Sequence, residues 1–435
     1  MSEQETDLYR TPEQEQAEAG RGVPDASDMA LADINPVNAH LFKENRWQDH
    51  FARLRKEDPV HFNEISSAGR YWSVTRYADI KKVDADWRTF SSAGGITLGF
   101  RPGTEQAQSM FTGASPFIAQ DPPVHDEQRN TVVGVVAPNN LAKLESLIRE
   151  RTARVLDGLP VGETFDWVDT VSIELTTMML ATLFDFPFED RRKLTRWSDI
   201  VFAIPEPGGV VESQRQKQQE LQECLAYFST LWEERRSNPG DDLVSMLVHG
   251  EATRDLPPAA HLGNLLLLIV GGNDTTRNTM SGSVYALNRF PAQYDKLIES
   301  PQLIPAMVSE VIRWQTPLSY MRRTANHDCE LNGKQIRAGD QVLMWYVSGN
   351  RDESVFERAD ELDIERPNAR QHLSFGFGIH RCMGNRLAEM QLRVLWEEIL
   401  KRFERIEVMG EPTRTFSSFV KGYTHLPVRV IAKTD

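Results

Sequence analysis

A single cysteine stands in a glycine-rich segment that precedes a long amphipathic stretch. The segment runs Phe-Gly-Phe-Gly-Ile-His-Arg-Cys-Met-Gly over Phe375–Gly384, and its cysteine is Cys382. Its glycines let backbone pass close to a flat group and adopt positive φ where needed. Backbone N–H groups of such a loop, and the N-terminus of the helix expected over about 384–403, favour a thiolate. Cys382 is therefore a candidate metal ligand, whereas Cys224 and Cys329 are expected to be inert, as free cysteines usually are.

The longest predicted helix carries a second set of residues suited to chemistry. Prolines at 257, 258 and 291 bound a helix from about Pro258 to Arg289, which would be roughly 48 Å long. Its middle reads Gly-Gly-Asn-Asp-Thr-Thr over 271–276. Two adjacent glycines cost about 1 kcal/mol each in a helix interior. We expect them to allow close approach, either of another helix or of a bound group beside Asp274 and Thr275.

Both segments resemble those of the cytochrome P450 superfamily, the haem-thiolate monooxygenases. Residues 375–384 match F-x-x-G-x-x-x-C-x-G at every fixed position. With 20 Phe, 27 Gly and 3 Cys in 435 residues, chance predicts roughly 0.0005 such matches. The resemblance implies that Cys382 ligates the iron of haem b, and that Phe375, Gly376 and Gly384 shape the loop around the cofactor. Thiolate ligation of this kind favours O–O cleavage.

The glycine pair of the long helix is similar to the oxygen-activation motif of the same superfamily. By that resemblance Asp274 and Thr275 form the catalytic pair. Thr275 would hydrogen-bond the oxygen ligand of the iron, and Asp274 would relay protons from solvent. A threonine within a helix can also divert a backbone carbonyl and open a groove for water.

The resemblance further assigns cations to the propionates of the cofactor, which carry two negative charges. His125 and Arg129 are spaced i and i+4, which places them on one helical face. Arg323 and His380 occupy the other matching positions. Each of these four side chains, taken alone, would more often be an ordinary surface or core residue.

An E-x-x-R pattern at Glu310 and Arg313 predicts an ion pair on one helical face. Taken alone, a solvated surface pair would be the better interpretation. The resemblance adds Arg366 as a third member and makes the triad structural, a clamp that holds the cysteine loop in place.

The rest of the sequence predicts the helices and strands that hold these segments in place. Most of it is expected to be helical, with short strands at 71–75, 341–347 and 428–432 and an edge strand at 59–62. The resemblance implies a mainly α, triangular cytochrome P450 fold with small β-sheets, and haem between the long central helix and the cysteine-loop helix. Residues 1–30, with eight acidic and two basic side chains, predict a disordered tail, and residues 31–435 a single domain.

Composition excludes several classes of protein. Three cysteines without paired spacing indicate a reducing, cytoplasmic location. No signal-peptide pattern occurs, and the longest apolar run, Leu265–Val270, is too short for a membrane anchor. The tail accounts for −6 of the net charge of −14, and the remaining −8 argues against nucleic acid as a partner.

The substrate prediction depends on four runs that are similar to the bacterial soluble alkane hydroxylases: 44–47, 51–60, 271–278 and 419–427. That family oxidises the terminal methyl of medium-chain alkanes, and often fatty acids. Terminal attack requires a site that holds the methyl in place and keeps inner methylenes away, so we expect a narrow tunnel. Its candidate walls, each of which could equally be plain core, are Ile96, Leu98, Phe100, Val201, Phe202, Ile204, Val270, Gly271, Leu318, Met321, Phe419 and Val420.

Electrons must come from partner proteins, because the chain has no flavin or iron–sulfur motif. The resemblance implies O2 as co-substrate and a ferredoxin with its ferredoxin reductase, fed by NAD(P)H. Arg381 and Arg386 are candidate docking cations for the ferredoxin.

Three alternatives remain open from the sequence. The same chemistry could act on a terpene or steroid-like substrate. A haem sensor without oxygenation is more distant, because it needs no proton relay such as Asp274-Thr275. A zinc protein is more distant still, because Cys382 and His380 have no second Cys/His pair at ligand spacing.

Overall fold

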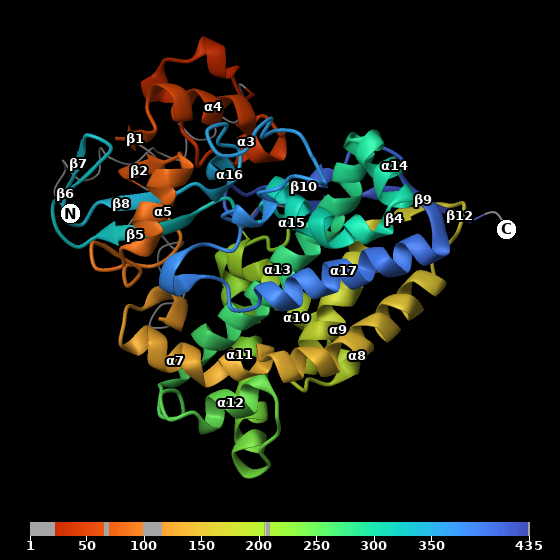
Figure 1. The fold of residues 1–435 in the computed structure, drawn as a ribbon. Helices are drawn as coiled ribbons and strands as arrows, with labels where there is room; N and C mark the ends of the chain where they lie inside the picture. The colour runs from red at the N-terminus through yellow and green to blue at the C-terminus, as the bar shows by residue number, and fades with distance from the viewer. Residues whose placement is uncertain (1–21, 65–68, 99–114, 204, 206–208, 434–435) are drawn as a thin grey trace. The chain divides into compact units, whose positions relative to one another are not determined.

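The structure, a computed structural model, describes residues 22–64, 69–98, 115–203, 205 and 209–433, apart from the side chain of Phe202. Contacts divide the chain into two compact units. We call residues 1–107, 309–382 and 413–424 the sheet unit, and residues 108–308, 383–412 and 425–435 the helical unit. Figure 1 shows the course of the chain through both, and each is described by itself.

The sheet unit is built on a five-stranded sheet with the order β1-β2-β8-β5-β3. Its strands are β1 (Val60–Asn63), β2 (Tyr71–Val74), β3 (Phe90–Ser91), β5 (Met321–Ala325) and β8 (Gln341–Met344). β1 lies at the edge, where a strand preceded by proline is expected. β2 and β8 run parallel and the remaining neighbours antiparallel. Two small ladders pair β6 (Cys329–Leu331) with β7 (Lys334–Ile336) and β10 (Thr413–Arg414) with β11 (Tyr423–His425).

Short helices accompany this sheet. They are α3 (Ala39–Lys43), α4 (Trp47–Glu57), α5 (Tyr77–Ala85), α16 (Tyr346–Gly349) and most of α15 (Ile304–Gln315). α5 places Ile80 and Val83 in one apolar core with Trp72 and Met344 of the sheet. The predicted strand over 341–347 therefore ends early, because the chain turns into α16 after Trp345.

Residues 22–30, which composition places in the acidic tail, contact α4. Arg46 donates to the carbonyl oxygen of Val23, and Arg53 donates to those of Ala26 and Met29. Val23 is buried. Contacts with the rest of the chain therefore begin before residue 30, because Arg46, the N-cap of α4, and Arg53 within it bind backbone carbonyls. Residues 1–21 lie outside the described residues.

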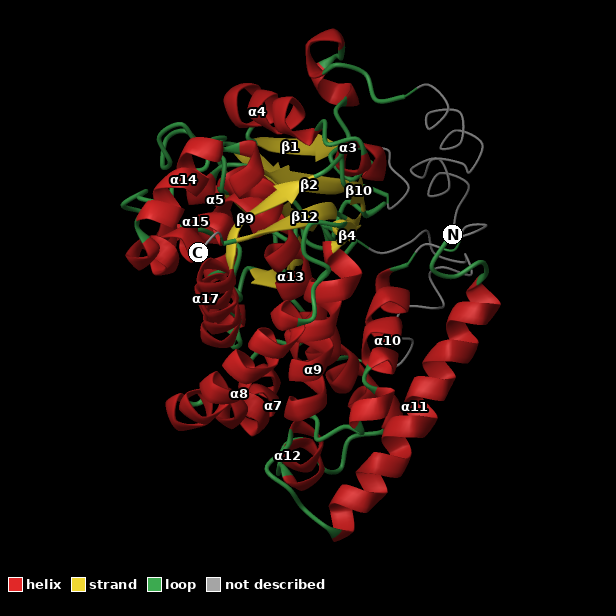
Figure 2. Cartoon of the chain, turned by 90° about the vertical axis from the view of Figure 1, so that its right-hand side faces the viewer, coloured by secondary structure: helices red, strands yellow, loops and turns green. Residues whose placement is uncertain are grey.

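The helical unit contains the remaining α-helices of the described residues. They are α7 (Val124–Val132), α8 (Pro138–Asp157), α9 (Glu174–Leu183), α10 (Arg192–Phe202), α11 (Gln214–Ser237), α12 (Leu243–His249), α13 (Pro258–Arg289), α14 (Pro291–Glu299) and α17 (Asn385–Arg402). A three-stranded sheet, β4-β12-β9, completes the unit with β4 (Thr164–Asp166), β9 (Phe403–Val408) and β12 (Pro427–Ala432). Figure 2 shows α10 and α11 side by side.

α13 has the predicted bounds, because Pro257 caps its first turn and Pro291 begins the next helix. Most of its central residues are buried. α9 and α10 pack against it. In the described part of the chain, no helix combines the length and apolarity that a membrane crossing requires.

Candidate active site

The cysteine loop, residues 375–384, is closed by its own backbone. The amide of Cys382 donates to the carbonyl of Phe375 at 2.8 Å, and the amide of Gly376 donates to that of Leu373 at 2.8 Å. Gly376 and Gly378 have φ of 67° and 70°, the left-handed conformation that glycine favours. Gly384 instead caps α17 at φ −86°. The side chain of Cys382 is exposed, as a ligand to a group bound from outside the loop must be.

Asp84, near the end of α5, holds this loop. Its Oδ2 accepts from the amide of Phe377 at 2.7 Å and from the hydroxyl of Tyr346 at 2.8 Å. Its Oδ1 accepts from Nη2 of Arg323 at 2.7 Å. Burial raises the pKa of Asp84, while Arg323 and the loop amide oppose that rise. Sequence reasoning missed Asp84, because its partners lie more than 230 residues away along the chain.

The four candidate propionate ligands fall into two pairs. In the sheet unit, Arg323 is buried against Asp84, and Nε2 of His380 lies 3.0 Å from the hydroxyl of Ser92. In the helical unit, Nδ1 of His125 lies 2.7 Å from Asp126, and Arg129 is half-buried one turn further along α7. Burial lowers the pKa of His125.

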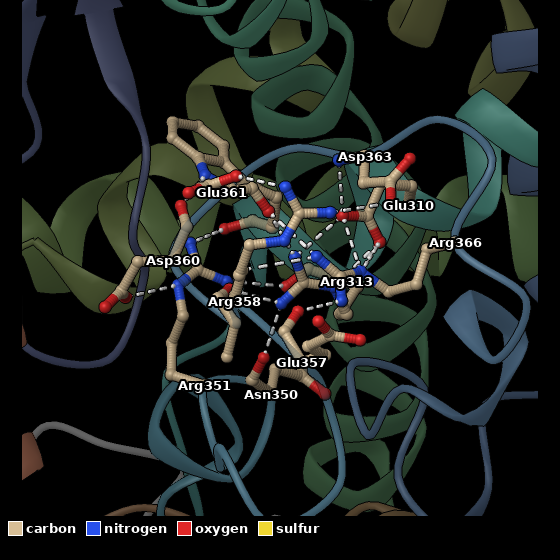
Figure 3. Close-up of polar contacts among 12 residues, drawn as sticks. Glu310, Arg313, Asn350, Arg351, Glu357, Arg358, Asp360, Glu361, Asp363 and Arg366 are labelled. Carbon is tan, nitrogen blue, oxygen red and sulfur yellow. Dashed lines mark hydrogen bonds and ion pairs between the residues drawn. The ribbon is translucent and has the colours of Figure 1, made fainter.

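Glu310, Arg313 and Arg366 meet as one buried cluster (Figure 3). Nη2 and Nε of Arg313 donate to the two carboxylate oxygens of Glu310 at 2.7 and 2.8 Å. Nε of Arg366 donates to both oxygens at 3.0 and 3.1 Å. The amide of Asp363 adds a further bond at 3.0 Å. The remaining Arg313 N–H groups donate to the carbonyls of Asn350, Ala359 and Glu361, so the cluster binds the backbone of residues 350–366.

The two glycines in the middle of α13 have different surroundings. A Cβ on Gly272 would lie 2.8 Å from Cδ2 of Leu180 in α9, so this glycine allows helix packing. A Cβ on Gly271 would meet nothing within 4 Å, and Gly271 is exposed. The hydroxyl of Thr275 donates to the carbonyl of Gly271 at 3.0 Å, one turn along the same face. One glycine thus serves packing, and the other leaves an open face beside Thr275.

Asp274, the residue before Thr275 in α13, is buried. Its Oδ1 accepts from Nη2 of Arg277 at 2.9 Å and from the side-chain Nδ2 of Asn273 at 3.2 Å. Nη1 of Arg277 binds Asp199 of α10 at 2.8 Å. Burial raises the pKa of Asp274 to about 6; Arg277 opposes the rise and Asp199 adds to it. Neither Arg277 nor Asp199 was predicted, although Arg277 lies one helical turn after Asp274 and that spacing could have revealed it.

The predicted wall residues of the sheet unit gather around Tyr320. Leu318 bridges to Val420, the ring of Phe419 lies 5.3 Å from that of Tyr320, and the amide of Leu98 donates to the Tyr320 hydroxyl at 3.4 Å. The carbonyl of Ile96 accepts a hydrogen bond from the amide of Arg322 in β5, the strand that begins at Met321. Sequence reasoning missed Tyr320, although it stands directly beside Met321.

In the helical unit, Val201 and Val270 share one apolar core. Phe100 and Ile204 lie outside the described residues, as does the side chain of Phe202. Arg381 and Arg386 are exposed. Within the described residues, no three His, Cys, Asp or Glu side chains gather as a metal site.

Comparison with known proteins adds an independent line of argument. The family model described as cytochrome P450 matches residues 38–424. The chain is 37% identical to linalool 8-monooxygenase of Pseudomonas putida, over 91% of this chain and 98% of that protein. It is 31% identical to a methyl-branched lipid omega-hydroxylase of Mycobacterium tuberculosis, over 87% and 90%.

Among solved structures, CYP153D17 of Sphingomonas sp. PAMC 26605 superimposes with a TM-score of 0.84 at 48% identity, covering 92% of this chain and 100% of that one. This likeness confirms the predicted fold class, mainly helical with small sheets. The family match spans both chemical motifs and the Glu310 cluster between them. The chain belongs to the cytochrome P450 family and is a monooxygenase that uses haem with thiolate-ligated iron.

Proposed function

We propose that this enzyme inserts one atom of O2 into a C–H bond of a chain-end methyl, with medium-chain alkanes and fatty acids as its substrates. The observation that carries the proposal is the open face of α13 at Gly271, beside Thr275. A chain end can lie on this open face beside Thr275, where the positioning of the reacting methyl decides the product. Four runs shared with the bacterial alkane hydroxylases support the same substrate class.

The residues present fit haem b. Cys382 is exposed at the end of a loop whose positive-φ glycines, Gly376 and Gly378, lie against Asp84 of α5. It would hold the iron, and Arg323, His380, His125 and Arg129 would bind the propionates as cations and hydrogen-bond donors. When bound, the haem supplies the activation of dioxygen.

Asp274 and Thr275 would manage the protons of the reaction. Because burial raises the pKa of Asp274 to about 6, its carboxyl group can gain and lose a proton near neutral pH. Arg277 and Asn273 fix the orientation of that carboxyl group. Thr275 lies on the exposed face of α13, where its hydroxyl can bind and pass on a proton.

The names of the relatives support attack at a chain end. An omega-hydroxylase acts, by its name, at the terminal carbon of a lipid. Carbon 8 of linalool is also a methyl at the end of a chain. The second candidate function is therefore the same reaction on an acyclic terpene, and the relative at 37% identity favours it.

The electrons would arrive from NAD(P)H through a ferredoxin reductase and a ferredoxin. Arg381 and Arg386 flank Cys382 in sequence, and both side chains are exposed. Ferredoxins are acidic, so these arginines would steer a ferredoxin toward the cysteine loop, and the steering would weaken at high salt.

Product analysis tests the proposal. The enzyme, with surrogate ferredoxin and reductase, is given linear alkanes, fatty acids, linalool and a steroid. We expect 1-alkanols or ω-hydroxy acids as the main products. Turnover of linalool alone would favour the second candidate, and subterminal mixtures would remove the chain-end claim.

A further inference from the structure

We propose that Asp84 is a positioning residue for haem, because one buried carboxylate joins the cysteine loop to the propionate candidate Arg323. The proposal rests on the haem-thiolate function proposed above. Asp84 belongs to no motif of the sequence analysis, and no residue of α5 was predicted to act in the reaction.

The carboxylate of Asp84 is buried and surrounded by hydrogen-bond donors. Asp84 is 2% exposed. Three donors converge on it: the amide of Phe377 and the hydroxyl of Tyr346 on Oδ2, and Nη2 of Arg323 on Oδ1. Phe377 lies five residues before Cys382, on the loop that carries the ligand. Asp84 therefore fixes the backbone of that loop directly.

The loop also rests on the backbone of Asp84. A Cβ on Gly378 would lie 2.4 Å from the carbonyl oxygen of Asp84, and one on Gly376 would lie 3.5 Å from its Oδ2. Gly378 therefore leaves no room for a side chain between the loop and Asp84. A longer acid at position 84 would displace the loop that it holds.

Arg323 receives its position from the same carboxylate. Its side chain is 3% exposed, and its N–H groups bind Asp84 at 2.7 Å and the carbonyl of Arg322 at 2.9 Å. These two hydrogen bonds fix the plane of the Arg323 guanidinium group. Because the group is planar, they also fix the direction in which its other N–H groups point. Asp84 thus orients the cation that would meet a propionate.

An asparagine at position 84 cannot serve both partners. If its carbonyl oxygen faces Phe377 and Tyr346, its NH2 group faces the N–H of Arg323, and two donors meet. If it is turned round, the NH2 group faces the amide of Phe377, and two donors meet there instead. Asp84→Asn therefore loses one of the two links at nearly constant volume.

The experiment compares the wild-type enzyme, Asp84→Asn and a matched control, Asp79→Asn, all loaded with haem. Asp79 lies on the same helix, and its Oδ2 accepts an exposed hydrogen bond from Asn332. The readouts are the rate of haem transfer to apomyoglobin, the Soret band of the reduced carbon-monoxide complex, and far-ultraviolet circular dichroism as a check of the fold.

We expect Asp84→Asn to lose haem roughly tenfold faster than the wild type, because a charge-assisted bond is lost. Part of its carbon-monoxide complex should lack the red shift of thiolate ligation. Asp79→Asn should match the wild type in both readouts. Equal spectra and equal haem loss for the two variants would overturn the proposal.

A double variant separates positioning from simple misfolding. In Asp84→Asn/Arg323→Gln, the Asn carbonyl can face the loop while its NH2 group donates to the Gln carbonyl. The thiolate band should recover, whereas haem retention should stay low because the cation is gone. No recovery in a folded double variant would contradict the proposed link. If the wild type itself lacks the thiolate band, the haem-thiolate function fails instead.

Discussion

Two buried carboxylates, Glu310 and Asp274, show how differently one chain uses the same chemical group. Glu310 accepts from two arginines and one backbone amide. Asp274 shares a single arginine, Arg277, with a competing acid, Asp199. Burial is nearly complete for both, at 0% and 3% exposure.

The difference lies in the compensation of the charge. A buried carboxylate surrounded by cationic donors is stable as an anion, and its partners become part of the scaffold. A buried carboxylate that shares its one arginine with a second acid has a raised pKa, as Asp274 does. Such a group can exchange a proton near neutral pH. The comparison predicts that changes at Glu310 harm the fold and changes at Asp274 harm the reaction.

The largest effect is expected from Glu310→Gln. Losing one charge of a buried ion pair leaves Arg313 and Arg366 uncompensated, which costs about 3–5 kcal/mol. Urea denaturation followed by circular dichroism measures the change in the free energy of unfolding. The control is Glu361→Gln, whose half-exposed side chain pairs with Arg358 on the surface and should change little. Equal stability of the two variants would refute the structural role of the cluster.

Asp274→Asn should leave the fold intact and slow the reaction. The amide has the same shape, and Arg277 retains Asp199 as its partner. Loss of the proton-exchanging group should lower product formation by roughly 10²–10⁴-fold. Single-turnover product formation, with circular dichroism as the check of the fold, measures this. An active Asp274→Asn enzyme would mean that the carboxylate is structural, as in the Glu310 cluster.

A pH series sharpens the same comparison. The pKa of Asp274 is raised from 3.8 to about 6, so the folded protein binds more protons there than the unfolded chain between about pH 4 and 6. The stability contribution of Asp274 therefore falls as pH rises through that window. Its protonated fraction falls in the same range, and the rate of proton-limited turnover should decline as pH rises through about 6.

Asp199→Asn should shift the decline of turnover with rising pH to lower pH values. Asp199 raises the pKa of Asp274, and without it Arg277 is left to pair with Asp274 alone. Both effects favour the ionised carboxylate. Glu220→Gln is the control, because it breaks the ion pair of α10 with α11 through Arg196 and leaves Asp274 untouched. Superimposable pH profiles for the two variants would show that Asp199 does not act on Asp274.

Sequence reasoning reached what is local along the chain. Prolines gave the bounds of α13, and the i, i+3 spacing predicted the Glu310–Arg313 pair. The position of Arg366 came only from family resemblance. Contacts between distant segments stayed hidden, because no pattern within α5 or α10 indicates that Asp84 binds the cysteine loop or that Asp199 binds Arg277.

The two glycines of α13 illustrate the limit most clearly. Sequence reasoning offered close packing or a bound group as alternatives for the pair, whereas Gly272 packs against Leu180 and Gly271 lies on an open face. Amphipathic periodicity could not separate them, since residues on both sides of the helix are apolar or small here. Only the position of Leu180 on α9 distinguishes the packed face from the open one.

The smallest effect, and the most specific, is expected from Gly271→Ala. Its methyl group would meet no protein atom within 4 Å, so the fold should be kept and the helix stabilised by up to about 1 kcal/mol. The added methyl would narrow the space beside Thr275 and shift chain-length preference or the ratio of terminal to subterminal products. Gly272→Ala is the matched control, because its methyl meets Leu180 and should lower stability without a change in product ratio. If the two variants exchanged these effects, the open face would be on the wrong side of α13, and the assignment of Thr275 to the reaction would fall with it.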